Sequence, residues 1–230
     1  MLHCRVDVLN PQHFRTILFD LDGTLADTAP DLADALNTVL INNGNSPLPF
    51  EQIRPVVSHG GMALVRLGFG ISQDHPDFEP LRQQLLGVYA ARIANKTQLF
   101  PGMDELLNSI EKAGMNWGVV TNKPAWLTQP LLDALQLTHR ASSIVSGDTL
   151  AERKPHPSPL LYACQQAGSE SMQCVYVGDA ERDIVAGHRA GMATVVALFG
   201  YIGQDDHPES WGADALLESP HHIKEWLQLG

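Results

Sequence analysis

Short apolar runs alternate with amphipathic segments along most of the chain. A continuous apolar run is typical of a strand that is buried on both faces of a sheet. The segments between the runs carry apolar residues every three or four positions and predict helices, such as Met103–Ala113 and Ile184–Ala190, each closed by a glycine. The runs that we expect to form strands are Thr16–Phe19, Trp117–Val120, Ser143–Val145, Cys174–Val177, Thr194–Leu198 and a weaker one at Ala215–Leu217.

This alternation predicts an α/β fold, in which a Rossmann-like parallel sheet is covered by helices on both faces. In such sheets, ligands bind beyond the carboxyl ends of the strands. Asp20, Thr121 and Asp179 each follow one of the apolar runs directly. We therefore expect these three side chains, which are far apart in the chain, to meet at one edge of the sheet.

Residues 29–100 follow a different pattern, with helical stripes and no predicted strand. One helix is expected to begin at a capping box formed by Thr28 and Asp31 and to end at Gly44, and a second begins near Asp77. The segment therefore predicts a small all-helical cap domain inserted after the first strand. The predicted division is a cap over 29–100, hinges near 28–30 and 99–102, a catalytic core over 14–28 and 101–230, and an N-terminal extension over 1–13.

Composition narrows the class of protein. The chain has 230 residues, of which 44% are hydrophobic and 18% charged, which is ordinary for a globular protein, and it has no apolar run long enough to span a membrane. The net charge of −11 disfavours nucleic acid and anionic membranes as partners. Cys4, Cys164 and Cys174 form no Cys-x-x-Cys, and no secretory signal is visible, so we expect a cytoplasmic protein. The choice between monomer and homodimer stays open.

Two carboxylates, Asp20 and Asp22, follow the run Ile17–Phe19 directly, and Gly23 comes next. An unpaired buried carboxylate is costly, and two like charges this close would force a proton onto one of them. A bound divalent cation removes this conflict. Dense carboxylate ligands suit Mg²⁺, which also binds water and substrate phosphate, so we expect Mg²⁺ as the cofactor.

The segment Asp20-x-Asp22-Gly23-Thr24-Leu25 resembles the first motif of the haloacid dehalogenase superfamily of phosphohydrolases. The later motifs of that superfamily are a Thr or Ser that ends a second strand, a Lys before a helix, and an acidic pair after a third strand. Thr121, Lys154 and the pair Asp179 and Asp183 match these motifs in order. The resemblance covers nearly the whole chain.

The resemblance implies a role for each of these residues. Asp20 is the nucleophile that forms an aspartyl-phosphate, and Asp22 is the general acid and base. We expect burial and neighbouring negative charge to let the Asp22 carboxyl carry a proton near neutral pH. The implied Mg²⁺ ligands are Asp20, the backbone carbonyl of Asp22, and Asp179, with Asp183 orienting a metal-bound water or Lys154; the implied phosphate contacts are Thr121, Asn122 and Lys154.

Other interpretations stay open for several of these residues. Thr121 could simply end a strand, and Lys154 could be a solvated loop lysine. Asn122 and Lys123 could contact the phosphate or the cap. His59, at the start of a predicted cap helix, could face the substrate or lie in an ordinary loop.

Within the superfamily, a carboxylate at position 22 favours hydrolysis of phosphate esters over dehalogenation. The predicted cap contains a single lysine, Lys96, at its exit, which disfavours the phosphonate-cleaving branch. Several segments resemble the phosphoglycolate phosphatase branch, and within it most of all the N-acetylmuramic acid 6-phosphate phosphatases of cell-wall recycling. These segments are Phe100–Met103, Gly118–Pro124 and Gly200–Ile202, together with Trp117 and Trp211–Asp214.

The resemblance thus implies hydrolysis of a small phosphorylated metabolite, with N-acetylmuramic acid 6-phosphate as the first expectation. Phosphoglycolate is the alternative substrate. A phosphosugar mutase and a non-catalytic sensor of a phosphorylated ligand also stay open, because both could use the same pocket.

Overall fold

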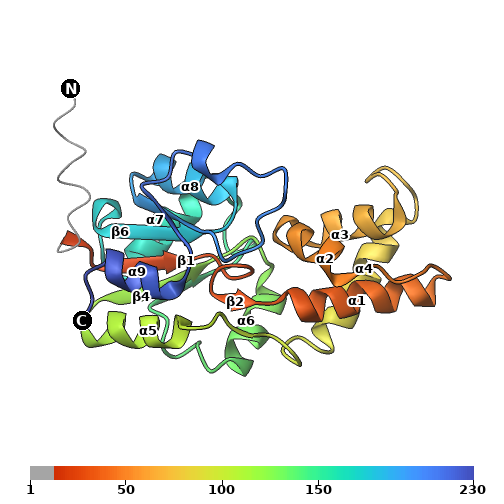
Figure 1. The fold of residues 1–230 in the computed structure, drawn as a ribbon, viewed down its shortest axis with the longest axis horizontal. Helices are drawn as coiled ribbons and strands as arrows, with labels where there is room; N and C mark the ends of the chain where they lie inside the picture. Colours follow the sequence, from red (N-terminus) through yellow and green to blue (C-terminus); the bar gives the residue numbers. More distant parts are fainter. Residues whose placement is uncertain (1–12) are drawn as a thin grey trace.

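The protein, described here from a computed structural model, consists of a core built on one sheet and a helical cap beside it (Figure 1). The sheet has six strands, all paired in parallel, in the order β5-β4-β1-β6-β7-β8. The predicted parallel sheet is confirmed, with differences of one residue at the ends of three strands. The strands are β1 Thr16–Phe19, β4 Asn116–Val120, β5 Ser143–Val145, β6 Cys174–Gly178, β7 Ala193–Ala197 and β8 Ala215–Leu217.

Helices cover both faces of the sheet. In β1, Ile17 and Phe19 belong to one buried apolar cluster and Leu18 to a second, because successive side chains of a strand point to opposite faces. The predicted helix over 184–190 begins earlier, at Glu181, where the Asp183 carboxylate accepts the backbone N–H of Ala180. The helices on one face are α5 Met103–Lys112, α6 Ala125–Ala134 and α9 Pro220–Trp226, and those on the other are α7 Ser158–Gln166 and α8 Glu181–Ala190 (Figure 1).

The structure describes residues 13–230, so nearly all of the predicted N-terminal extension lies outside it. Within the described part of the chain, no helix is long and apolar enough to cross a lipid bilayer. Cys164 and Cys174 are both free and buried, and their sulfur atoms lie 2.9 Å apart.

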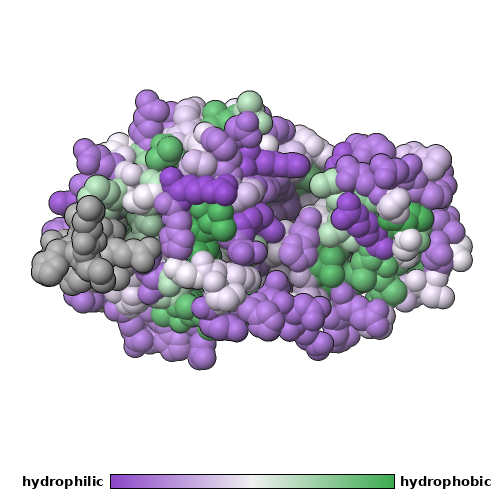
Figure 2. Space-filling view, turned by 90° about the horizontal axis from the view of Figure 1, so that it is seen from above, coloured by the Kyte–Doolittle hydropathy of each residue, from purple (hydrophilic) through white to green (hydrophobic). Residues whose placement is uncertain are grey.

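The apolar residues at the centre of the cap, which include Leu36, Leu64, Leu85 and Tyr89, belong to the same buried cluster as one face of the sheet. Figure 2 shows a recess between the core and the cap that is bordered mainly by hydrophilic residues. The recess therefore lies where residues of the core and of the cap meet. The helical segments of the cap are α1 Ala29–Asn42, α2 Phe50–Ile53, η2 Arg54–His59, α3 Gly60–Phe69 and α4 Phe78–Ala90.

The two connections between core and cap lie side by side. The strand β2, Ala26–Asp27, pairs antiparallel with β3, Gln98–Leu99. The expectation that residues 29–100 contain no strand is therefore wrong at Gln98–Leu99. A strand of two residues is too short to produce an alternating pattern in the sequence.

The predicted capping box at the start of α1 is also wrong. Thr28 makes no capping hydrogen bond; its Oγ1 donates to Asp22 Oδ1 at 2.6 Å. Asp31 instead accepts from the backbone N–H and the hydroxyl of Thr97, at 2.8 and 2.7 Å. The two side chains therefore join the entrance of the cap to the loop after β1 and to the exit of the cap.

Candidate active site

The carboxyl ends of three neighbouring strands form the site. β1 lies between β4 and β6 in the sheet, and Asp20, Thr121 and Asp179 follow these strands. All three residues are buried. The expected meeting of residues about 160 positions apart is confirmed for Asp20 and Asp179, because carboxylate oxygens of both belong to one cluster.

The acidic cluster consists of Asp20, Asp179 and Asp183. Each residue offers one carboxylate oxygen, and these oxygens lie within 4.8 Å of one another. Burial raises the pKa of Asp179 to about 7, and the neighbouring charges of Asp20 and Asp183 add to the rise. Burial likewise raises the pKa of Asp20, although the ammonium of Lys154 opposes that rise. Without a cation, the cluster is therefore electrostatically unfavourable at neutral pH.

A divalent cation fits this cluster. Asp179 Oδ1 is buried and has no hydrogen-bond partner among the described residues. Its other oxygen, Oδ2, accepts from the Ser58 hydroxyl at 2.6 Å and from the Tyr201 N–H at 2.9 Å. Three clustered carboxylates provide the hard oxygen ligands that Mg²⁺ prefers. The side chains that could hold Mg²⁺ are thus Asp20, Asp179 and Asp183, and ligation by the Asp22 carbonyl stays a prediction.

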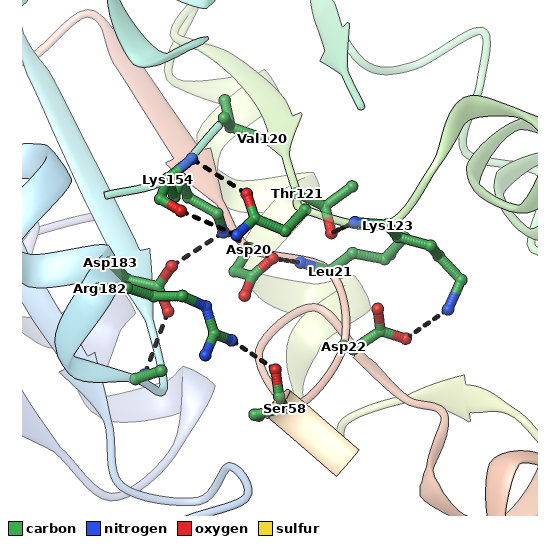
Figure 3. Close-up of polar contacts among 12 residues, drawn as sticks. Asp20, Leu21, Asp22, Ser58, Val120, Thr121, Lys123, Lys154, Arg182 and Asp183 are labelled. Carbon is green, nitrogen blue, oxygen red and sulfur yellow. Dashed lines mark hydrogen bonds and ion pairs between the residues drawn. The ribbon is translucent and has the colours of Figure 1, made fainter. Parts of the chain in front are cut away.

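Lys154 supplies the positive charge inside the site (Figure 3). Its Nζ lies 2.9 Å from Asp20 Oδ1 and 2.8 Å from Asp183 Oδ1. The ammonium also donates to the Tyr176 hydroxyl at 2.7 Å, which in turn donates to the Val120 carbonyl at 2.8 Å. The Lys154 side chain is 1% exposed, so the interpretation as a solvated loop lysine is wrong.

Asn122 and Thr121 hold the backbone around this lysine. The Asn122 side chain accepts from the Lys154 N–H and donates to the Lys154 carbonyl, both at 3.0 Å. Thr121 Oγ1 accepts from the Lys123 N–H at 3.1 Å. The structure thus gives both side chains an orienting role, and their contacts with phosphate stay predictions.

Asp22 points to a lysine rather than to the acidic cluster (Figure 3). Its Oδ1 lies 2.8 Å from Lys123 Nζ and also accepts from the Thr28 hydroxyl. The ammonium of Lys123 also lies 4.5 Å from the ring centre of Tyr89, on cap helix α4. The direct ionic partner of Asp22 is therefore a cation, which the sequence did not lead us to expect. Burial opposes the charge of Lys123, but Asp22 more than offsets it, so that the pKa of Lys123 lies above its ordinary value.

A cavity of about 220 Å³ lies beside the cluster, on the side of the cap. His59 lines it, which favours the substrate-facing interpretation of this residue. Ser58, Arg182 and Tyr201 line it too, and the sequence analysis assigned no role to them. Arg182 could have been noticed, because it is the one basic residue inside the acidic motif that ends at Asp183. Ser58 and Tyr201 carry no comparable signal.

The haloacid dehalogenase-like hydrolase family model matches residues 17–197, so the chain belongs to this family. The chain is 46% identical over 211 residues to a phosphoglycolate phosphatase of Xanthomonas campestris. The alignment covers 92% of this chain and 95% of the relative. Among solved structures, a predicted phosphoglycolate phosphatase from Haemophilus somnus superposes with a TM-score of 0.82 at 30% identity, covering 93% of this chain and 97% of that chain. The protein is therefore a phosphatase that acts on phosphoric monoesters.

Two relatives from one organism, Pseudomonas putida, carry different names. The N-acetylmuramic acid 6-phosphate phosphatase is 38% identical and covers 92% of this chain and 95% of the relative. The phosphoglycolate phosphatase is 36% identical and covers 81% of this chain and 70% of the relative. The full length of this chain thus corresponds better to the first.

Proposed function

We propose that this phosphatase hydrolyses N-acetylmuramic acid 6-phosphate through an aspartyl-phosphate on Asp20, with Mg²⁺ as cofactor. The buried cluster of Asp20, Asp179 and Asp183 around Lys154 is the observation that carries the chemistry. The match to the muramate enzyme of Pseudomonas putida, at 38% identity over 92% of this chain and 95% of the relative, supports the substrate.

The surroundings of Asp20 orient its carboxylate for attack. Oδ1 accepts from the Leu21 N–H at 2.7 Å and is paired with Lys154. The other oxygen, Oδ2, attacks phosphorus, and the bond from phosphorus to the ester oxygen breaks. Lys154 offsets charge on the phosphoryl oxygens, and Thr121 donates its hydroxyl to them. When bound, Mg²⁺ supplies further neutralisation of the phosphate and the carboxylates.

Asp22 moves the protons of both half-reactions. Lys123 and Thr28 hold its Oδ1, so that Oδ2 stays available for the leaving oxygen. In the proposed cycle Asp22 enters protonated, gives that proton to the leaving oxygen, and takes a proton back from the water that hydrolyses the aspartyl-phosphate. The enzyme returns to its starting state after one phosphate and one alcohol are released.

Measuring kcat/KM for N-acetylmuramic acid 6-phosphate, phosphoglycolate and hexose 6-phosphates tests the substrate. We expect the muramate ester to give the highest value and EDTA to abolish turnover until Mg²⁺ is restored. A clear preference for phosphoglycolate would reject the muramate assignment, and turnover that persists in EDTA would reject the cofactor.

Phosphoglycolate is the second candidate, because the Xanthomonas campestris relative at 46% identity carries that name. Release of inorganic phosphate separates either hydrolase from a mutase or a sensor. The proposed partner is in each case a small phosphorylated metabolite, and the proposed compartment is the cytoplasm, which the free thiols of Cys164 and Cys174 support.

A further inference from the structure

The cavity beside the acidic cluster contains a guanidinium group with most of its hydrogen-bonding capacity unused. Arg182 extends from the first turn of α8, and its Nη2 donates to the Ser58 carbonyl of the cap at 2.7 Å (Figure 3). This is its one hydrogen bond within residues 13–230, and no carboxylate of that range lies within ion-pair distance of it. A guanidinium carries five N–H donors. Arg182 therefore has donors to offer a ligand.

Arg182 lies in the field of the acidic cluster but makes no direct ion pair with its carboxylates. Burial opposes its charge, but the fields of Asp183, Asp20 and Asp179 raise its pKa above the ordinary value. Lys154, not Arg182, makes the direct ion pairs with Asp20 and Asp183. The guanidinium is thus attracted towards the cluster but remains unpaired, fixed by the Ser58 carbonyl.

A ligand of Arg182 would lie on the leaving-group side of the substrate. In the proposed mechanism the phosphoryl group lies at Asp20 and Lys154, whereas the cap residues Ser58 and His59 line the cavity that holds Arg182. Three acids line the cavity: Asp179 of the acidic cluster, Glu181 and Asp206. Glu181 is exposed and Asp206 accepts the Gly203 N–H at 2.7 Å, and among the described residues none of the three lies within ion-pair distance of Arg182.

We propose that Arg182 binds a carboxylate on the leaving group and so restricts the enzyme to phosphomonoesters of hydroxy acids. A carboxylate matches the planar fork of a guanidinium with two parallel hydrogen bonds. The inference rests on the proposed phosphatase function and deepens it. N-acetylmuramic acid carries its carboxylate on a lactyl ether and phosphoglycolate carries one next to its ester carbon, so each candidate substrate offers a carboxylate to Arg182.

Two pairs of substrates test this inference. N-acetylmuramic acid 6-phosphate and N-acetylglucosamine 6-phosphate differ only in the lactyl group, and phosphoglycolate and its amide differ in the charge of one group. The pair with the higher kcat/KM is the one to analyse. Within that pair we expect the wild-type enzyme to have a roughly 10- to 100-fold higher kcat/KM for the charged member, because a charged hydrogen-bonding site rejects ligands that lack its partner. In Arg182→Gln the charged member loses that advantage, while the uncharged member changes less than about threefold.

Arg54→Gln is the matched control. Arg54 also joins the cap to the core, through the Phe199 carbonyl at 3.2 Å and the ring of Tyr201 at 5.0 Å. If this contact only helps to close the cap, its removal lowers kcat/KM for both members of a pair alike. Arg182→Lys keeps the charge and loses the fork, so it should recover part of the preference. Thermal unfolding of each variant checks that the fold is retained.

The outcomes distinguish this inference from the substrate assignment. Equal losses for both members of a pair in Arg182→Gln overturn it, and so does a wild-type enzyme without preference for the carboxylate. The wild-type enzyme could instead prefer phosphoglycolate to the muramate ester and lose that activity selectively in Arg182→Gln. This outcome would overturn the proposed substrate and support the role of Arg182.

Discussion

Lys123 forms a partly buried ion pair with Asp22, with 2.8 Å between Nζ and Oδ1, although the two residues are 101 positions apart in the chain. The same ammonium lies over the ring of Tyr89 in the cap. One side chain of the core therefore contacts both the proposed acid and base and a helix of the cap. This contact links the closed position of the cap to the orientation of Asp22.

Lys123→Met should lower both stability and turnover. The substitution leaves Asp22 without its cation, and for a partly buried pair the loss of one partner costs about 1–3 kcal/mol. We expect kcat to fall roughly 100-fold, because Asp22 is then no longer held towards the leaving oxygen. Chemical denaturation and steady-state kinetics measure the two effects.

Lys96→Met is the control for this prediction. Lys96 pairs with Asp34 at 2.7 Å, but both side chains are about half exposed. Exposed pairs contribute about 0–1 kcal/mol, so this variant should behave nearly as wild type. If Lys123→Met were as active as Lys96→Met, the ion pair with Asp22 would have no catalytic importance.

Gly23→Ala should remove activity because position 23 has no room for a methyl group. Gly23 has a φ of +83°, and a Cβ there would overlap the Asp179 carboxylate. Gly44 also has a positive φ, +76°, but a Cβ there would meet nothing within 4 Å. Gly44→Ala should therefore show the cost of backbone strain alone, about 1 kcal/mol, with activity retained.

Gly23→Ala should be clearly less stable than Gly44→Ala and should lose at least about 100-fold in kcat/KM, because Asp179 must move. Thermal unfolding and phosphate release measure the difference. Equal behaviour of the two variants would show that the close approach of Gly23 to Asp179 has no functional consequence.

The stability of the metal-free enzyme should fall as pH rises from about 5 to 7. The pKa of Asp179 is about 7 in the folded protein and near 3.8 in an unfolded chain, so the folded state binds more protons within this range. Ionisation of Asp179 therefore lowers the free energy of unfolding by at most about 4 kcal/mol. Added Mg²⁺ should raise the melting temperature more at pH 8 than at pH 5, because it compensates for the ionised cluster.

Asp179→Asn is the control for the pH prediction. The amide does not titrate, so the variant should show a flatter pH dependence of the melting temperature between pH 5 and 7 and a smaller shift with Mg²⁺. An unchanged slope in this variant would mean that other groups, such as the histidines, cause the dependence.

The sheet and the acidic edge could be predicted from the sequence because their signals are local. The continuous apolar runs place the strands, and the carboxylates that follow two of them, Asp20 and Asp179, must then lie at the same edge. Asp183, four residues after Asp179, was also recognised as part of the site. Its place in the cluster itself depends on the start of α8, which the apolar pattern does not show.

The cap contacts could not be predicted, because they depend on long-range partners. Thr28 and Asp31 fit a capping box by their spacing, yet their side chains bind Asp22 and Thr97 instead, at 2.6 and 2.7 Å. Similarly, the residues next to Lys123 in the sequence do not predict that its side chain contacts Asp22 and Tyr89. Ser58 meets Asp179 only when the cap lies against the core.

The most direct test of the account is the release of inorganic phosphate by Asp20→Asn in the presence of Mg²⁺. The substitution keeps the size of the side chain but replaces the nucleophilic carboxylate by a neutral amide. With a melting temperature near that of wild type, kcat should fall at least about 1,000-fold, which corresponds to about 4 kcal/mol of activation free energy. Turnover within about tenfold of wild type would contradict covalent catalysis by Asp20.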